Sequence, residues 1–352
     1  MESSSDHATY AIDGSESLPS IDDGSDWTSA DSNSMRTDSD SALGGSSLRS
    51  STMSLQSSAY ENLEENGRTY HRRGNYHLPN DDIEKDRLDL QHALFILTFH
   101  NNLYLAPIGD NPQRVLDLAT RTGIWAIDFA QLHPSAAVIG TDLSPIQPEF
   151  VPPNCTFEID DAEDEWTFRY KFDYIHGRAL GTCFKDPGSV VAKAFDALQP
   201  GGYLELQDAI MPMQYVGEIP VSSFLYRWNC HVVESSTMAQ RPWTNVKHYP
   251  EYFIAAGFEE IRAKKFFWPS NTWPKGEYLK HLSVYFQKDL MDGLEGLSMK
   301  LFTNFLGWTK EQVQEFLVGV RKDLQDRSIH AYIEISVVYG KKPDEPLEVH
   351  SD

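Results

Sequence analysis

The chain has 352 residues and a formal net charge of −22, with 30 Lys and Arg against 52 Asp and Glu. So negative a charge argues against general binding to DNA, RNA or anionic membranes, because phosphate contacts need clustered basic side chains. The apolar fraction of 40% is ordinary for a globular protein, and the length exceeds one typical domain, so we expect one large domain with a polar tail.

Residues 1–60 are rich in Ser, Asp and Gly and poor in large apolar residues. This composition buries too little apolar surface to offset the entropy of ordering, so we expect a disordered tail. A passive solubilising role is favoured over control by phosphorylation. Without a signal peptide, paired cysteines or an apolar run near the roughly 20 residues of a membrane span, the sequence predicts a soluble cytoplasmic protein, with the nucleus as the alternative location.

A helix is predicted to begin at Asp81. Pro79 precedes it, and Asp81 and Glu84 have the spacing of a capping box. Ile83, Arg87, Leu90, Leu94 and Leu97 fall on one face of this helix. That mostly apolar face should pack against the edge of a sheet.

The most informative stretch runs from Arg114 to Asp142. A short apolar run ends in Asp117, a tight turn closes at Gly123, an amphipathic helix follows, and a second apolar run ends in Asp142. This order predicts a βαβ unit that binds a nucleotide, because the backbone after its first strand passes close beneath the ligand. Asp142, at the tip of the second strand, is placed to accept hydrogen bonds from both ribose hydroxyls.

Later runs rich in β-branched and aromatic residues predict five more strands, at 156–160, 172–178, 203–207, 261–268 and 331–339. Helices are predicted near 187–198, 277–305 and 309–324. Strands that alternate with helices in this way indicate an α/β fold with a mostly parallel sheet. In such sheets, ligands bind at the carboxyl ends of the strands.

Two strand ends carry the candidate catalytic residues. His176 can act as a general base, orient a substrate or be a hydrogen-bonded structural histidine, and all three interpretations stay open. Asp208 follows the fifth strand at its tip, where a side chain can meet a substrate, whereas Glu205 lies within the strand. His281 is a further side chain to test. No P-loop, zinc-ligand spacing or GxSxG elbow is present, so no metal site is predicted.

Four segments resemble the fungal LaeA-like group of class I S-adenosylmethionine (SAM) dependent methyltransferases, namely 124–130, 138–148, 151–166 and 201–207. The resemblance extends from about Glu61 to about Pro343. The group contains regulators of secondary metabolism and enzymes that modify secondary metabolites. It implies a Rossmann-like α/β fold with a seven-stranded, mostly parallel sheet, helices on both faces and helical insertions that cover the substrate.

The resemblance also implies a domain plan. A methyltransferase domain spans 61–343, between the tail at 1–60 and a disordered C-terminus at 344–352. Within the domain it implies a lid and helix at 61–108, a SAM-binding core at 109–208, substrate-cover helices with strand six at 209–330, and a final strand at 331–340.

By resemblance, the residues that contact SAM are Tyr70, Asp117, Ala119, Thr120, Gly123, Asp142, Leu143, Asp161 and Ala162. Asp161 is expected to accept a hydrogen bond from the adenine amino group, and Ala162 to border the ring. Tyr70 falls in a segment that folds over the cofactor in many class I methyltransferases. A packing aromatic is the plainer interpretation of Tyr70.

The turn after the first strand of the βαβ unit departs from the family pattern, Asp-hydrophobic-Gly-x-Gly-x-Gly. Ala119 and Arg121 replace two glycines, and only Gly123 remains. Glycine is used in such turns because it tolerates positive φ and leaves no Cβ beneath the ligand. If the φ of Arg121 is positive, the backbone strain there is of order 1 kcal/mol. If the guanidinium turns outward or pairs with the cofactor's carboxylate, the chain still binds SAM. If it fills part of the pocket, SAM binding is lost. The other cofactor-binding signals in the sequence favour the first alternative.

The resemblance implies SAM-dependent methyl transfer to a small-molecule secondary metabolite. Aromatic-rich insertions, at 211–246 and between the last two strands, favour an aromatic or apolar substrate. One alternative is a LaeA-like regulator that acts in the nucleus with a velvet-type protein partner. Another is a methyltransferase-like protein that no longer transfers methyl, for which Arg121 is the main reason.

Overall fold

The computed structural model describes residues 11–12, 62–72 and 76–344. Its centre is an eight-stranded sheet in the order β1-β9-β10-β8-β7-β4-β5-β6. In chain order the strands are β1 (Ala11–Ile12), β4 (Arg114–Leu118), β5 (Ala137–Asp142), β6 (Cys155–Ile159), β7 (Phe172–Arg178), β8 (Leu198–Tyr215), β9 (Glu259–Pro269) and β10 (Ala331–Lys341). A separate hairpin joins β2 (Asn62–Glu65) to β3 (Arg68–His71).

Strands β6, β5, β4, β7 and β8 run parallel, whereas β10 is antiparallel to both of its neighbours, β8 and β9. The predicted fold class, a seven-stranded, mostly parallel sheet, is therefore confirmed. The eighth strand, β1, pairs in parallel with the edge strand β9, and Ala11 lies opposite Arg262. Disorder was expected throughout 1–60; the structure describes a strand at Ala11–Ile12, and 1–10 and 13–61 lie outside the described residues.

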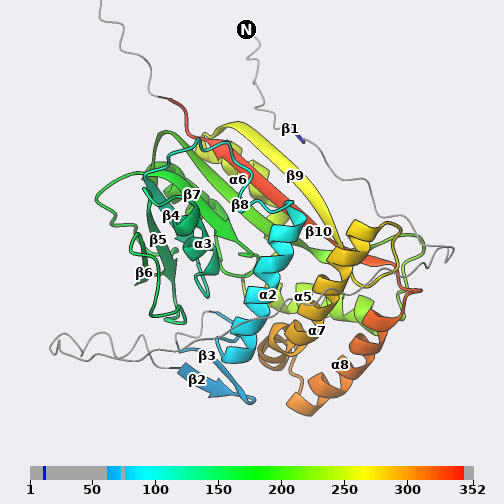
Figure 1. Cartoon of the computed structure of the whole chain (residues 1–352). Coiled ribbons are helices and arrows are strands. Elements are labelled where there is room, and N and C mark those ends of the chain that lie inside the picture. The colour runs from blue at the N-terminus through cyan, green and yellow to red at the C-terminus, as the bar shows by residue number, and fades with distance from the viewer. Residues whose placement is uncertain (1–10, 13–61, 73–75, 345–352) are drawn as a thin grey trace, which may run out of the picture.

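Helices cover both faces of the sheet (Figure 1). They are α2 (Asp82–Thr98), α3 (Ile124–Leu132), α4 (Pro187–Ala197), α5 (Phe224–Met238), α6 (Tyr249–Ala256), α7 (Glu277–Phe305) and α8 (Lys310–Gln325), with a 3₁₀ helix at Trp243–His248. One core cluster joins the sheet to α2, α3, α5, α7 and α8, and a second joins its other face to α4 and α6. Strands β4 and β7 are buried between the two clusters, which explains their short, continuous apolar runs.

Helix α2 begins as predicted, because the Asp81 side chain accepts a hydrogen bond from the Glu84 amide. Its buried face agrees with the predicted one only in part, because Arg87 and Leu94 are buried, whereas Ile83 is 59% exposed and Glu84 is buried in its place. The periodicity of apolar residues did not reveal the burial of Glu84 because part of the contact between α2 and α7 is an ion-pair network. Arg87 binds both Glu84 and Asp289 of α7, at 2.7 Å each.

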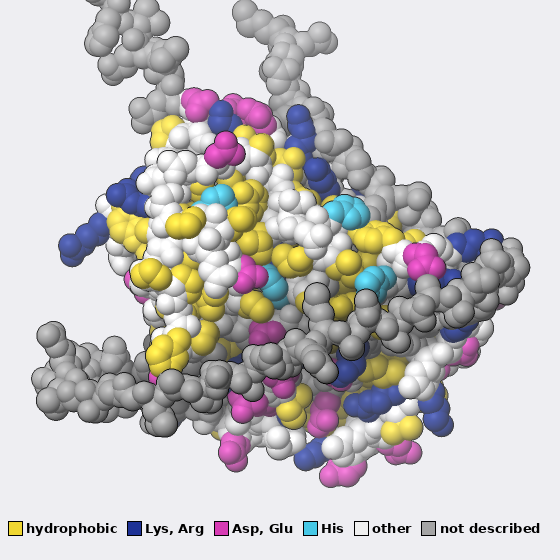
Figure 2. All heavy atoms as spheres, viewed as in Figure 1, with side chains coloured by type: hydrophobic (Ala, Val, Ile, Leu, Met, Phe, Trp, Pro, Cys, Tyr) yellow, Lys and Arg dark blue, Asp and Glu magenta, His cyan; other side chains and the backbone are white. Residues whose placement is uncertain are grey.

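The helices α5, α7 and α8 lie together toward the lower right of Figure 1, and α7 runs alongside α2. Indole Nε1 of Trp228 in α5 donates to Ser298 of α7, and the Leu225 amide donates to Asp323 of α8. None of the helices in the described ranges is long and apolar enough to cross a membrane. Figure 2 shows acidic side chains gathered over the lower part of α2, in keeping with the negative net charge.

Candidate functional site

The turn between β4 and α3 keeps the backbone of a glycine-rich loop although two glycines are missing. Ala119, Arg121 and Gly123 have φ of 49°, 58° and 78°. Glycine adopts such angles without strain, whereas alanine and arginine do so at a cost of about 1 kcal/mol each. At Gly123 the space also requires glycine, because a Cβ would lie 2.2 Å from the ring of Phe157. The chain therefore holds a strained turn under the site.

Asp142, at the end of β5, fixes this turn. Its Oδ2 accepts a hydrogen bond from the Arg121 amide at 2.8 Å, and its Oδ1 accepts one from the Ser144 amide at 2.9 Å. Burial raises the pKa of Asp142, while these two hydrogen bonds act to lower it. Each carboxylate oxygen has a second lone-pair direction, so Asp142 can still accept hydrogen bonds from a ligand.

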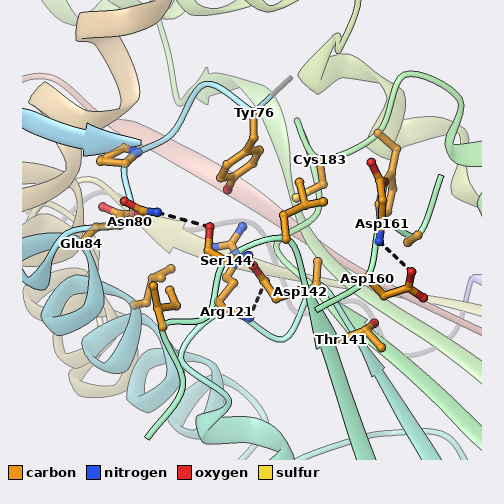
Figure 3. Close-up of a pocket in the computed structure, with 17 residues that line it drawn as sticks. Tyr76, Asn80, Glu84, Arg121, Thr141, Asp142, Ser144, Asp160, Asp161 and Cys183 are labelled. Carbon is orange, nitrogen blue, oxygen red and sulfur yellow. Dashed lines mark hydrogen bonds between the residues drawn. The ribbon is translucent and has the colours of Figure 1, made fainter. Parts of the chain in front are cut away.

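A first cavity, of about 670 Å³ with its open mouth included, lies above this turn (Figure 3). It gathers the predicted residues Ala119, Asp142, Leu143, Asp161 and Ala162. They come from three segments, the turn after β4, the end of β5 and the loop after β6. The structure thus brings these five residues together at one cavity, and the ligand they hold stays a prediction.

Tyr70 does not reach this cavity. It is fully buried in β3, and the Lys300 ammonium lies 4.5 Å from the centre of its ring. Tyr76 lines the cavity instead, with its side chain directed inward (Figure 3). The place of Tyr70 therefore agrees with the packing interpretation and not with a lid over this cavity, because the packing of the β2–β3 hairpin decides which aromatic of the segment turns inward.

A second cavity, of about 390 Å³ with its mouth included, adjoins the first beneath α2 and includes Asp117, Thr120 and His176. His176 Nδ1 lies 2.7 Å from Asp117 Oδ1, and its ring stacks on Trp125 with ring centres 3.7 Å apart. Burial lowers the pKa of His176, against the opposing effect of Asp117. The neutral ring donates through Nδ1, so Nε2 is an acceptor, and it is buried with no hydrogen-bond partner among the described residues.

Arg178, at the end of β7, also lines the second cavity, although no role was predicted for it from the sequence. Its Nε donates to Gln207, Nη1 approaches His92, and Nη2 donates to the Leu103 carbonyl, at distances of 2.7, 3.0 and 3.1 Å. None of these three partners carries a negative charge: Gln207 and His92 are polar side chains, and the third is a backbone carbonyl. Burial lowers the pKa of Arg178 to about 10, so it stays protonated at neutral pH.

Arg121 lies where the first two cavities and a third one meet, and its side chain lines all three. One Nη donates to the carbonyl oxygen of Ala179, after β7, while Nε is buried without a partner in the described chain. Figure 3 shows the side chain beside Ser144, on the side of Tyr76. The outward orientation of Arg121 is therefore not the one the chain adopts.

The third cavity, of about 620 Å³ with its mouth included, is mostly apolar. Trp228, Trp243 and Trp268 line it, and their indole nitrogens donate to Ser298, the Ala209 carbonyl and Thr98 at 2.8, 3.1 and 2.7 Å. With their N–H groups occupied, the three rings offer only apolar surface. The polar lining includes Arg87, Gln91 and Asp289, where α2 meets α7.

Asp208 and His281 line none of these cavities. Strand β8 runs on to Tyr215 because it pairs with β10, so Asp208 sits opposite Ser336 within the strand and not at its tip. The Asp208 side chain is buried and accepts a hydrogen bond from the Tyr249 hydroxyl at 2.9 Å. His281 is exposed on α7, against Tyr285.

Asp208→Asn should be increasingly stabilising, relative to the wild type, as the pH rises. Burial raises the pKa of Asp208 from 3.8 to about 6, so the fold favours the protonated acid. Its contribution to stability is full below about pH 4 and is lost as the pH rises through about 6, whereas asparagine stays neutral. Urea unfolding at pH 4.5, 5.5, 6.5 and 7.5 measures the free energy of unfolding of the variant and of the wild type. The difference between the two should grow with pH to about 2 kcal/mol and then level off. A difference that does not change with pH would contradict this assignment.

Comparison with known proteins finds a methyltransferase family model and similar fungal proteins. Residues 90–260 match the family model described as a methyltransferase domain. The "Methyltransferase pytC" of Aspergillus terreus is 35% identical over 298 residues, which cover 84% of this chain and 92% of that protein. The "Probable methyltransferase tdiE" of Emericella nidulans is 33% identical, covering 75% and 84%. The "Secondary metabolism regulator LAE1" of Cochliobolus heterostrophus is 34% identical, covering 81% and 96%.

Proposed function

Because this chain belongs to the LaeA-like family of class I SAM-dependent methyltransferases, we propose that it transfers the methyl group of SAM to a small-molecule secondary metabolite. The observation that carries the proposal is the turn after β4. It keeps positive φ at 119, 121 and 123 despite the loss of two glycines, and Asp142, Asp161 and Ala162 line the cavity above it. Strain of this kind persists where a ligand site needs the backbone shape.

The residues of the first two cavities fit the two ends of SAM. In the first, Asp142 can accept the ribose hydroxyls, and Asp161 the adenine amino group, beside Ala162. In the second, the partnerless Nε2 of His176 is an acceptor for the amino group of the methionine end, and Arg178 is a cation for its carboxylate. His176 then serves the cofactor and not the substrate.

The chemistry that SAM supplies is a methyl group activated by a positively charged sulfur. The chain's own contribution is to hold the acceptor in line with that methyl and to exclude water, which can lower a barrier by about 7 to 11 kcal/mol. The third cavity supports an aromatic or apolar acceptor, because three tryptophan faces line it. Asp208 lines none of the three cavities and accepts a hydrogen bond from Tyr249, so our proposal gives it no contact with the substrate.

A regulatory role is the second candidate, favoured by the 34% identity to the LAE1 regulator. In that case a velvet-type protein would bind the chain, in the nucleus, and methyl transfer would be secondary. A third candidate, a fold that has lost methyl transfer, is favoured by the inward side chain of Arg121.

The test of the proposed function is an isotope experiment. Deletion of the gene in the source organism should cause one unmethylated metabolite to accumulate, and the purified chain with methyl-labelled SAM should convert that metabolite to a product that carries the label. Mass spectrometry of the extract, with and without the chain, measures the conversion. Altered transcripts across many biosynthetic clusters, with no labelled product, would instead support the regulator.

A further inference from the structure

We propose that the substrate is an aromatic or apolar carboxylic acid, whose carboxylate binds Arg121 and receives the methyl group to give a methyl ester. This inference rests on the proposed methyl transfer and names the class of substrate that the same site takes. It is carried by the charge of Arg121, by its place between the cavities, and by the lining of the third cavity.

No acidic side chain among the described residues forms an ion pair with the guanidinium of Arg121. Two cationic side chains, Arg87 and Arg121, are among the described residues that line the third cavity. Arg87 forms ion pairs with Glu84 and Asp289. Arg121 instead donates to a backbone carbonyl, its Nε has no partner in the described chain, and Asp142 accepts from its amide and not from its guanidinium. A cation held in this way favours an anionic ligand with hydrogen-bond acceptors.

The position of Arg121 places such an anion at the reacting end of the substrate. In SAM the sulfur joins the nucleoside to the amino-acid end, and the cavities proposed for those two ends meet at Arg121. The third cavity opens at the same side chain. A substrate that fills the third cavity with its apolar body therefore brings a terminal carboxylate to the junction where the methyl group must pass.

Electrostatics favour a carboxylate at this junction over a neutral group. The sulfonium of SAM and the guanidinium of Arg121 are both cations, and they repel each other unless an anion lies between them. A carboxylate offsets both charges. Arg178 lines the second cavity and supplies a separate cation for the carboxylate of the cofactor, which leaves Arg121 for the substrate.

The reaction balances without an acid or a base. A lone pair of the carboxylate oxygen forms the new bond to the methyl carbon, the bond from that carbon to sulfur breaks with its electrons on sulfur, and the products are a methyl ester and S-adenosylhomocysteine (SAH). No proton moves. This agrees with the lining of the third cavity, which His176, Asp208 and His281 do not reach and where Asp289, the acid among its described lining residues, is paired with Arg87.

The test is titration calorimetry on the full chain with 2-naphthoate, its neutral analogue 2-naphthamide, SAM and SAH. The wild type should bind naphthoate at least ~10-fold more tightly than naphthamide. Naphthoate should also tighten the binding of SAM by ~10-fold and leave that of SAH nearly unchanged, because only SAM carries the positive sulfur. Both effects should disappear in Arg121→Gln, while SAH binding stays within ~3-fold of the wild type.

Two further variants sharpen the test. Arg169→Gln removes an equal charge from an exposed position in the loop between β6 and β7, and it should behave as the wild type. Ala119→Gly/Arg121→Gly relieves the positive φ at both positions, so it should fold even if Arg121→Gln does not, and it should show the same loss of naphthoate binding.

Two results would overturn the inference. Equal affinity for naphthoate and naphthamide would show that no carboxylate is recognised, and a loss of SAH binding as large as that of naphthoate in Arg121→Gln would assign Arg121 to the cofactor. Failure of the wild type to bind either SAM or SAH, with naphthoate binding still dependent on Arg121, would overturn the proposed methyl transfer and the ester product, while recognition of a carboxylate would stand.

Discussion

Replacement of Gly123 by alanine should destabilise the fold by about 3 kcal/mol, because two costs combine at this position. The φ of 78° is strained for any residue with a Cβ, and the new methyl group would lie 2.2 Å from Cζ of Phe157. That ring has little room to move aside, since it also lies against Gly140, where a Cβ would be 2.7 Å from it. Urea unfolding of the purified variant measures the change.

Gly109 offers a matched control for this prediction. Its φ is 75°, almost that of Gly123, but apart from its immediate neighbours no atom of the described residues lies within 4 Å of the place where a Cβ would be. Gly109→Ala should therefore cost only the backbone strain, about 1 kcal/mol. The Gly123→Ala cost should also shrink when Phe157 is replaced by alanine in the same chain. Equal losses for the two glycine variants would show that Phe157 does not confine the turn.

Asp142→Ala should weaken SAH binding by ~100-fold or more, because two charge-assisted hydrogen bonds to the ribose would be lost, each worth about 1.5 to 3 kcal/mol. The same carboxylate holds the amides of Arg121 and Ser144, so the turn would also lose its anchor. Calorimetry with SAH measures the effect, and a thermal melt checks that the variant is folded.

Asp160→Ala serves as the control for Asp142→Ala. Asp160 lines the same cavity, and within the described part of the chain its side chain accepts one hydrogen bond, from the neighbouring Asp161 amide at 3.0 Å. The Asp160→Ala substitution removes the same charge but keeps the Asp142 carboxylate that is proposed to bind the ribose, so SAH binding should change by no more than ~3-fold. Similar losses in both variants would mean that Asp142 acts through the general charge of the cavity.

The βαβ unit could be predicted from the sequence because its signals are local. Its two strands are short runs of buried apolar residues, and Asp142 follows directly on the second. Asp81 could likewise be recognised as a helix cap, since a capping contact spans only three residues. The resemblance to a known family supplied the rest, namely the seven-stranded sheet and Ala119, Leu143, Asp161 and Ala162 among the residues of the first cavity.

The errors arose where a distant segment decides the outcome. The length of β8, and with it the place of Asp208, is set by pairing with β10 more than a hundred residues later. The buried face of α2 depends on Asp289, which neutralises Arg87 from another helix. The direction of the Arg121 side chain is set by the Ala179 carbonyl at the end of β7. None of these contacts leaves a periodic trace in the local sequence.

The short strand β1 has a practical consequence for how this protein is prepared. By pairing with β9 through Ala11 and Ile12, it covers part of the outer backbone of the last strand in the sheet. A shortened chain that starts near residue 60, as the composition of the tail invites, would leave those amide and carbonyl groups open. Open sheet edges pair readily with another copy of the chain, so the truncated protein should aggregate more readily than the full chain.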